Sequence, residues 1–258
     1  MHEAALFAAS LAGRAGTLSL RQPPFLPQLS RPLRSSLTII RPLLMLLLFC
    51  ASGLAHGWDM TRIMQQTNEL YEPDRAARKR LQAWHALLDQ QKLTGTEAQL
   101  DAVNRFFNAQ LFFADDRVIW GEADYWATPV ESLVNGSADC EDFTISKYFS
   151  LLKLGVPDEQ LRLTYVKSLK LDQAHMVLSY YPTPLSEPLI LDNLVRNILP
   201  ASRRSDLLPV YSFNSQGLWL PGKVSDRRVG SSRNLPQWQD LARKMRDEGF
   251  DMTLRTAQ

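Results

Sequence analysis

The segment 139–154 carries apolar residues on nearly every side of a helical projection, with Lys147 and Lys153 as the polar exceptions. A helix that is apolar all round has to be covered by other elements, because an exposed apolar face is unfavourable in water. The segment therefore predicts a largely buried helix at the centre of the fold.

Both ends of this helix are marked in the sequence. Asp139 is a suitable N-cap with Asp142 three residues later, and Gly155 followed by Pro157 ends the segment. These signals place Cys140 at the N-terminus of the central helix, where the helix dipole favours a negative charge.

The periodicity is helical before this segment and alternates after it. We predict one helix over 74–93 and a second from a Thr94–Glu97 capping box to Leu111, followed by an irregular stretch over 117–138. After the central helix we predict strands over 161–167, 174–181 and 188–192 and a hairpin of 210–213 with 218–220. A last helix is predicted over 236–245. Helices followed by neighbouring strands predict an α+β fold, with the helices packed on an antiparallel sheet.

The N-terminal region is typical of an export signal. Arg31, Arg34 and Arg41 precede the apolar run 43–55, which is shorter than the roughly 20 residues that a membrane-spanning helix needs. We predict a leader over 1–55, with the true start of translation further downstream, and a single domain over 56–258. An uncleaved membrane anchor is the alternative.

Without the leader the charge of the chain changes sign. Residues 1–55 carry five Arg and one Glu, so a chain of formal charge +2 leaves a mature part near −2. Its acidic and basic residues are interspersed, which predicts no nucleic-acid partner. Cys140 is then the sole cysteine, so an exported protein would carry a free thiol.

Three residues along the chain form a possible catalytic triad. Cys140 begins the central helix, His175 lies on a predicted strand, and Asp192 ends the next apolar run. A thiol needs a base to take its proton, and an imidazole needs a carboxylate to fix its tautomer. We therefore predict Cys140, His175 and Asp192 as nucleophile, base and orienting acid, although each alone is more often structural.

The acidic neighbours of Cys140 oppose ionisation of its thiol. Asp139, Glu141 and Asp142 would raise the thiol pKa unless a bound cation neutralised them. Clustered carboxylates suit a hard ion such as Ca²⁺, and the sequence has no His/Cys cluster for zinc. The alternative is a simple capping box with one solvated acid.

These motifs together resemble a known family. The segments that carry the resemblance are Asp124 to Glu131, Gly136, Asp139 to Phe143, Ala174 to Leu178 and Leu191 to Asn193. They resemble the bacterial transglutaminase-like cysteine proteinases, and most closely the periplasmic adhesin proteases among them.

The resemblance implies a papain-like, transglutaminase-like core with the triad given above. It also implies a Ca²⁺ requirement, with Asp139 and Glu141 as metal residues and Asp142 as a further possible ligand. Such proteases cut a large surface adhesin near its N-terminus, at a small-residue Ala-Ala site, and so release cells from a biofilm. An inner-membrane receptor of the LapD type captures them when cytoplasmic cyclic di-GMP is high. The mature chain is expected in the periplasm, without stable membrane insertion.

Two other functions remain open from the sequence. The same triad could transfer an acyl group to an amine, or the chain could be a non-catalytic binding module stabilised by calcium. Trp126 and Trp219 are candidate anchors for a receptor, although ordinary core packing is the simpler interpretation for each. Trp238 is predicted to lie in the core.

Overall fold

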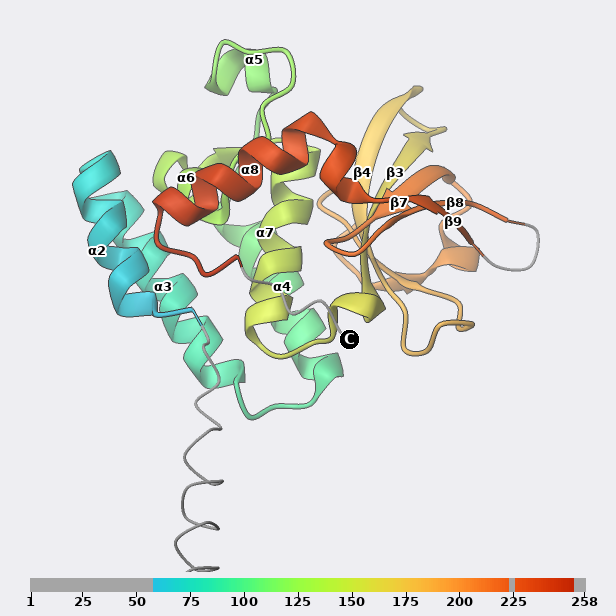
Figure 1. Ribbon diagram of the computed structural model, residues 1–258, viewed down its shortest axis with the longest axis horizontal. Helices are drawn as coiled ribbons and strands as arrows, with labels where there is room; N and C mark the ends of the chain where they lie inside the picture. The colour runs from blue at the N-terminus through green and yellow to red at the C-terminus, as the bar shows by residue number, and fades with distance from the viewer. Residues whose placement is uncertain (1–57, 223–225, 253–258) are drawn as a thin grey trace, which may run out of the picture. The chain divides into compact units, whose positions relative to one another are not determined.

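Most of the described helices precede the sheet along the chain, and the last one follows it (Figure 1). The computed structural model describes residues 58–222 and 226–252, which belong to the compact unit Ala55–Gln258. The predicted leader over 1–55 lies outside the described residues. The helices are α2 (Met60–Tyr71), α3 (Arg75–Gln91), α4 (Thr96–Gln110), α5 (Asp116–Ile119), α6 (Pro129–Asn135), α7 (Cys140–Lys153) and α8 (Pro236–Asp247).

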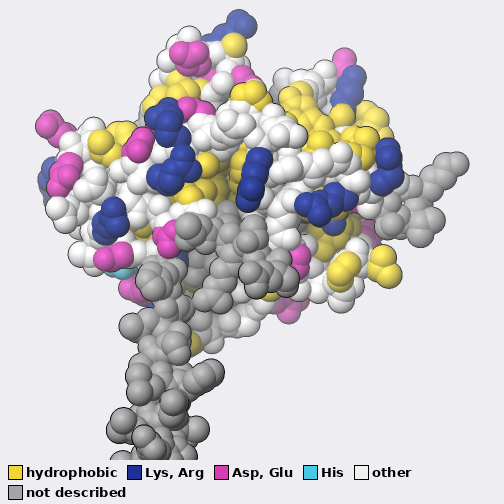
Figure 2. Space-filling model, in the orientation of Figure 1, with side chains coloured by type: hydrophobic (Ala, Val, Ile, Leu, Met, Phe, Trp, Pro, Cys, Tyr) yellow, Lys and Arg dark blue, Asp and Glu magenta, His cyan; other side chains and the backbone are white. Residues whose placement is uncertain are grey.

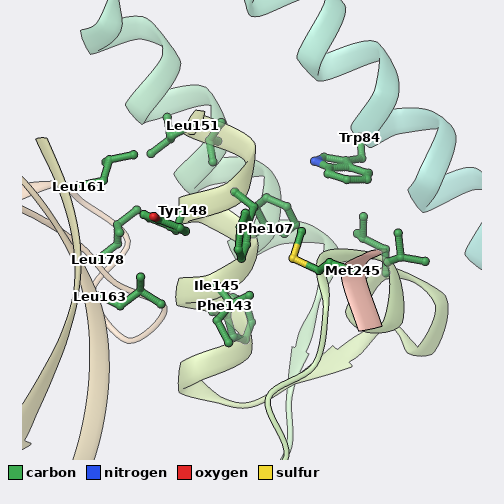
Figure 3. Close-up of a cluster of buried hydrophobic side chains, with 14 of the residues drawn as sticks. Trp84, Phe107, Phe143, Ile145, Tyr148, Leu151, Leu161, Leu163, Leu178 and Met245 are labelled. Carbon is green, nitrogen blue, oxygen red and sulfur yellow. The ribbon is translucent and has the colours of Figure 1, made fainter. Parts of the chain in front are cut away.

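The central helix is confirmed as α7. It lies between α3 and α4 on one side and the sheet on the other, and most of its side chains are buried (Figures 1 and 3). Asp139 caps it and forms a capping box with Asp142, while Gly155 follows it in the left-handed region at φ 91°. Lys147, one of the two polar exceptions, is only 1% exposed and therefore lies inside the fold with the apolar residues.

The sheet is antiparallel throughout and has the strand order β6-β5-β4-β3-β7-β8-β9. Its strands are β3 (Leu161–Ser168), β4 (Gln173–Tyr180), β5 (Leu189–Leu191), β6 (Leu199–Pro200), β7 (Leu207–Phe213), β8 (Leu218–Leu220) and β9 (Arg227–Gly230). Leu161, Leu163 and Leu178 pack against α7 in the main core (Figure 3). The predicted α+β class is confirmed.

The stretch before α7 is more regular than predicted. It contains α5, α6 and β2 (Ser137–Ala138), which pairs in parallel with β1 (Phe112–Phe113). The Thr94–Glu97 capping box is wrong, because the Thr94 hydroxyl donates to the Gln91 carbonyl and Gly95 is the N-cap of α4. Helix α2 was not predicted.

The two ends of the described chain meet in the core. Trp58 donates its indole N–H to the Asp251 carbonyl at 3.0 Å, and its ring contacts Phe250 edge to face. Helix α8 packs nearby through Trp238, which is 6% exposed and stacks on Phe149, so the prediction for Trp238 is confirmed. Among the described residues, no helix combines the length and the apolar character needed to cross a membrane.

Basic and acidic side chains are mixed over the face drawn in Figure 2. Lys and Arg side chains lie singly or in small groups between Asp, Glu and apolar side chains, and they form no continuous basic strip over the described part of this face. This distribution agrees with the interspersed charges in the sequence.

Candidate active site and metal site

Cys140 is the first residue of α7, which places its sulfur against strand β4. The Cys140 thiol donates to Glu141 Oε2 at 3.0 Å, and the Met176 backbone N–H also hydrogen bonds the sulfur. Burial raises the pKa of the Cys140 thiol and the Glu141 carboxylate adds to that shift, while the Met176 N–H opposes it. The structure therefore holds a neutral thiol next to the strand residue that follows His175.

His175 and Asp192 are brought together as their spacing predicted. His175 Nε2 lies 2.8 Å from Asp192 Oδ1, and the two residues are only 3% and 1% exposed. Burial acts to raise the pKa of Asp192, but hydrogen bonds from His175, Leu194 and Arg204 outweigh it and lower the pKa to about 2. Asp192 is thus an ionised carboxylate that fixes one ring nitrogen of the imidazole.

Arg204 completes this buried group and was missed from the sequence. Its Nη2 atom lies 2.7 Å from Asp192 Oδ2 and 2.9 Å from Asp206 Oδ2, and the side chain is 3% exposed. No local pattern marks it, because it approaches Asp192 only through the turn between β6 and β7. A buried carboxylate that needs a cation was the only available signal.

Lys147 is a second buried cation near Asp192. Burial lowers its pKa to about 7, and the charge of Asp192 acts in the opposite direction. Its ammonium lies 5.7 Å from the centre of the Phe143 ring. Asp192 therefore has basic groups nearby on both α7 and the segment before β7.

Carboxylates from two segments gather at the start of α7. Ligand atoms of Asp116, Asp139 and Asp142 lie within 4.8 Å of one another, and so do those of Asp116, Asp124 and Glu141. Asp116 belongs to both groups and was not among the predicted metal residues. The predicted capping box of Asp139 and Asp142 is present as well, so these acids both cap α7 and line the cluster.

The donor set suits a hard cation. Asp116 is 4% exposed; its Oδ2 accepts from the Tyr125 N–H, while Oδ1 is buried with no hydrogen-bond partner among the described residues. Burial raises the pKa of Asp139 to about 10, and the neighbouring charges of Glu141 and Asp142 add to the shift. A cation bound among these oxygens would supply the missing partner and reverse the mutual repulsion.

The two candidate anchor tryptophans differ in exposure. Trp126 is 8% exposed and stacks on Phe213 at 5.5 Å, so it belongs to the core. Trp219 is half-buried, and its ring lies 4.3 Å from the Arg162 guanidinium. The core interpretation is confirmed for Trp126, and an anchor role for Trp219 stays a prediction.

Comparison with known proteins agrees with this architecture. The family model of the bacterial transglutaminase-like cysteine proteinases matches residues 75–219. The solved structure of EGTA-treated LapG from Legionella pneumophila is 49% identical, with 71% of this chain and 97% of that chain covered and a TM-score of 0.63. Calcium-bound LapG from the same organism is 48% identical, with 72% and 99% covered and a TM-score of 0.63. No curated protein sequence gave a significant match.

Proposed function

The chain belongs to the bacterial transglutaminase-like cysteine proteinases, and from that premise we propose that it is a calcium-dependent cysteine endopeptidase with Cys140, His175 and Asp192 as its triad. The observation that carries this proposal is the buried 2.8 Å hydrogen bond between His175 and Asp192, one residue from the Met176 amide that contacts the Cys140 sulfur.

Each residue of the triad has a defined task in this reaction. Asp192 binds His175 Nε2, so Nδ1 is the ring nitrogen left to take the proton of the Cys140 thiol. The sulfur attacks the scissile carbonyl to form a thioester, and His175 gives its proton to the leaving amine. Water then attacks the thioester with His175 as base, which releases the acid and restores the thiol.

The tetrahedral intermediate needs hydrogen-bond donors for its oxyanion. The Cys140 backbone N–H belongs to the first turn of α7, where the helix itself supplies no acceptor. This N–H is therefore one suitable donor.

Calcium is the proposed metal because all the available ligands are carboxylates. Asp116, Asp139 and Asp142, with Glu141 beside them, would hold it. When bound, Ca²⁺ supplies positive charge that neutralises the acids around Cys140. The calcium-bound relative supports the same choice.

The resemblance to LapG supports a more specific biological role. We place the mature protein in the periplasm, where it cuts the N-terminal region of a large surface adhesin and releases cells from a biofilm. An inner-membrane receptor of the LapD type, which responds to cyclic di-GMP, would hold it inactive.

Cleavage of an adhesin N-terminal segment tests the proposal. The wild-type protein should cut the segment in Ca²⁺, stop in EGTA and recover when Ca²⁺ is restored. Cys140→Ala and His175→Ala should each abolish cleavage. His85→Ala is the matched control, because His85 is the other histidine of the described residues and pairs only with Asp89 on the surface.

Two results would contradict the proposal. Cleavage by Cys140→Ala would rule out the proposed triad. An unchanged rate of cleavage in EGTA would rule out the role of calcium. Adding a primary amine separates hydrolysis from acyl transfer, since only a transferase incorporates the amine in preference to water.

A further inference from the structure

A cavity lies on the sheet face that turns away from α7. Leu161, Leu163 and Leu178 face α7, whereas Val166 and Val177 alternate with them and form a separate apolar cluster with Ile190. A cavity of about 440 Å³ opens over this second cluster. Cys140, His175 and Asp192 are not among its lining residues, and its volume lies in the range of small-molecule sites.

Two arginines stand among the apolar walls of this cavity. Arg204 and Arg162 both line it, and each keeps one buried guanidinium nitrogen, Nη1 and Nε respectively, with no partner among the described residues. The Arg204 side chain is 97% buried, since 3% is exposed. A buried donor without an acceptor is unfavourable, so an occupant with a suitable oxygen would be stabilised there.

The charge around these arginines is already balanced. Arg204 pairs with Asp192 and Asp206, and Arg162 pairs with Asp226 at 2.6 Å. Each guanidinium charge is therefore already compensated by at least one carboxylate, so a further anion would find no uncompensated positive charge there. A cation would leave the two donors unmatched. The chemistry favours a neutral acceptor on an apolar body.

We propose that this cavity binds an uncharged, mainly apolar molecule whose carbonyl oxygen accepts from an arginine, as an acyl amide or ester does. Val166, Val177 and Ile190 would contact its apolar part. Arg204 lines this cavity and also pairs with Asp192, which binds His175. A ligand that contacts Arg204 would therefore also change the surroundings of His175. A free acyl amide and a short capped peptide share this chemistry.

Thermal unfolding of the full chain with matched probes tests the site. Octanamide should raise Tm by about 3 °C at a tenfold excess over its dissociation constant. Octanoate, of the same length but charged, should bind about tenfold more weakly because its charge is not compensated. N-acetyl-leucyl-leucinamide in a parallel arm distinguishes the sources, since the better stabiliser of the two neutral probes identifies the ligand as fatty amide or peptide.

Variants that fill the cavity locate the binding. Ala201→Trp and Leu207→Trp place a large ring at two half-buried lining positions and should each abolish the Tm shift, whereas Ala201→Ser should keep it. In the wild-type protein, methyl NMR signals of Val166, Val177 and Ile190 should shift on titration with octanamide. Unshifted methyl signals, equal binding of octanoate, or a Tm shift retained in a tryptophan variant that folds would each overturn the proposal.

Discussion

Asp192 connects the imidazole of His175 to the charge of Arg204. Its lowered folded pKa, about 2 against an ordinary value near 4, means that the ionised form is favoured by folding. That contribution to stability is present above about pH 4 and is lost as the pH falls towards about 2. Near neutral pH Asp192 is therefore ionised, as its proposed role in orienting His175 requires.

Replacing Asp192 with Asn tests this residue. Asp192→Asn should lower kcat by roughly a hundredfold, because a neutral amide can still accept from His175 but no longer stabilises the imidazolium formed when His175 takes the Cys140 proton. It should also destabilise the fold by about 3–5 kcal/mol, because Arg204 loses a buried partner. Asp206→Asn is the control, since Asp206 pairs with Arg204 but is 35% exposed. Equal loss of activity in both variants would argue against an orienting role for Asp192.

Glu248 is predicted to make stability fall as the pH rises. Burial raises its pKa to about 8, although hydrogen bonds from Thr128 and Tyr71 oppose the shift. The unfolded chain loses this proton near pH 4.3, so between those values the folded state binds more protons and the free energy of unfolding decreases. Urea unfolding at pH 5 and pH 8 should therefore show a smaller pH dependence in Glu248→Gln. Glu69→Gln, at an exposed position of α2, should show the same pH dependence as the wild type.

The α6–β2–α7 connection sets the position of Cys140, the proposed nucleophile. Gly136 follows α6 at φ 82°, and a Cβ there would lie 2.8 Å from Cζ of Arg80. Arg80 holds the Leu133 carbonyl at 2.7 Å. The glycine thus allows a tight turn directly beside Arg80, whose side chain donates to a carbonyl of the last turn of α6.

Substituting this glycine tests the connection. Gly136→Ala should cost roughly 1–2 kcal/mol in backbone strain and more from displacement of Arg80, and it should reduce kcat/KM because Cys140 moves with β2. Gly155→Ala, at φ 91° with no atom within 4 Å of the added Cβ, should show the strain alone. Chemical denaturation and peptide cleavage give the two readouts. Equal destabilisation of both variants would show that the close approach of Arg80 to Gly136 does not contribute to the cost.

Elements with strong local signals were predictable from the sequence, and weaker ones were not. The apolar circumference and the terminal signals of α7 defined it to within a residue or two. Helix α6 was missed because its Thr128–Glu131 capping box is followed by only two turns, among residues typical of loops. The Thr94–Glu97 pattern gave a wrong prediction, since the Thr94 hydroxyl binds the Gln91 carbonyl at the end of α3 and does not cap the start of α4.

At the scale of the whole molecule, the site is joined by contacts that no local pattern records. Asp116 reaches the acids of α7 from a separate segment, and Arg204 reaches Asp192 across a turn. The His175–Asp192 contact was predictable because His175 lies on one recognisable strand and Asp192 directly follows the next apolar run. The sequence therefore indicated the residues of the proposed triad, but not Arg204 and Asp116, which contact or neighbour them.

Calcium should stabilise the whole fold through these long-range acids. After EGTA treatment, Tm should rise steadily with the logarithm of added Ca²⁺, as expected for a ligand that binds the folded state. Asp116→Asn should weaken this response, because Asp116 contributes to both carboxylate groups. Asp101→Asn should leave it unchanged, since Asp101 pairs with Arg105 on the surface of α4. A response retained in Asp116→Asn would place the ion elsewhere.

The meeting of Trp58 with Phe250 and Asp251 has a consequence for biogenesis. Trp58 also contacts Phe149 and accepts from Lys153, but its contacts with Phe250 and Asp251 need the last described residues, so the core closes fully only after these have been synthesised. Folding during synthesis therefore stops short of completion. A polypeptide that stays open until its end is released suits a translocation pore that admits only unfolded chains, as the proposed export would require.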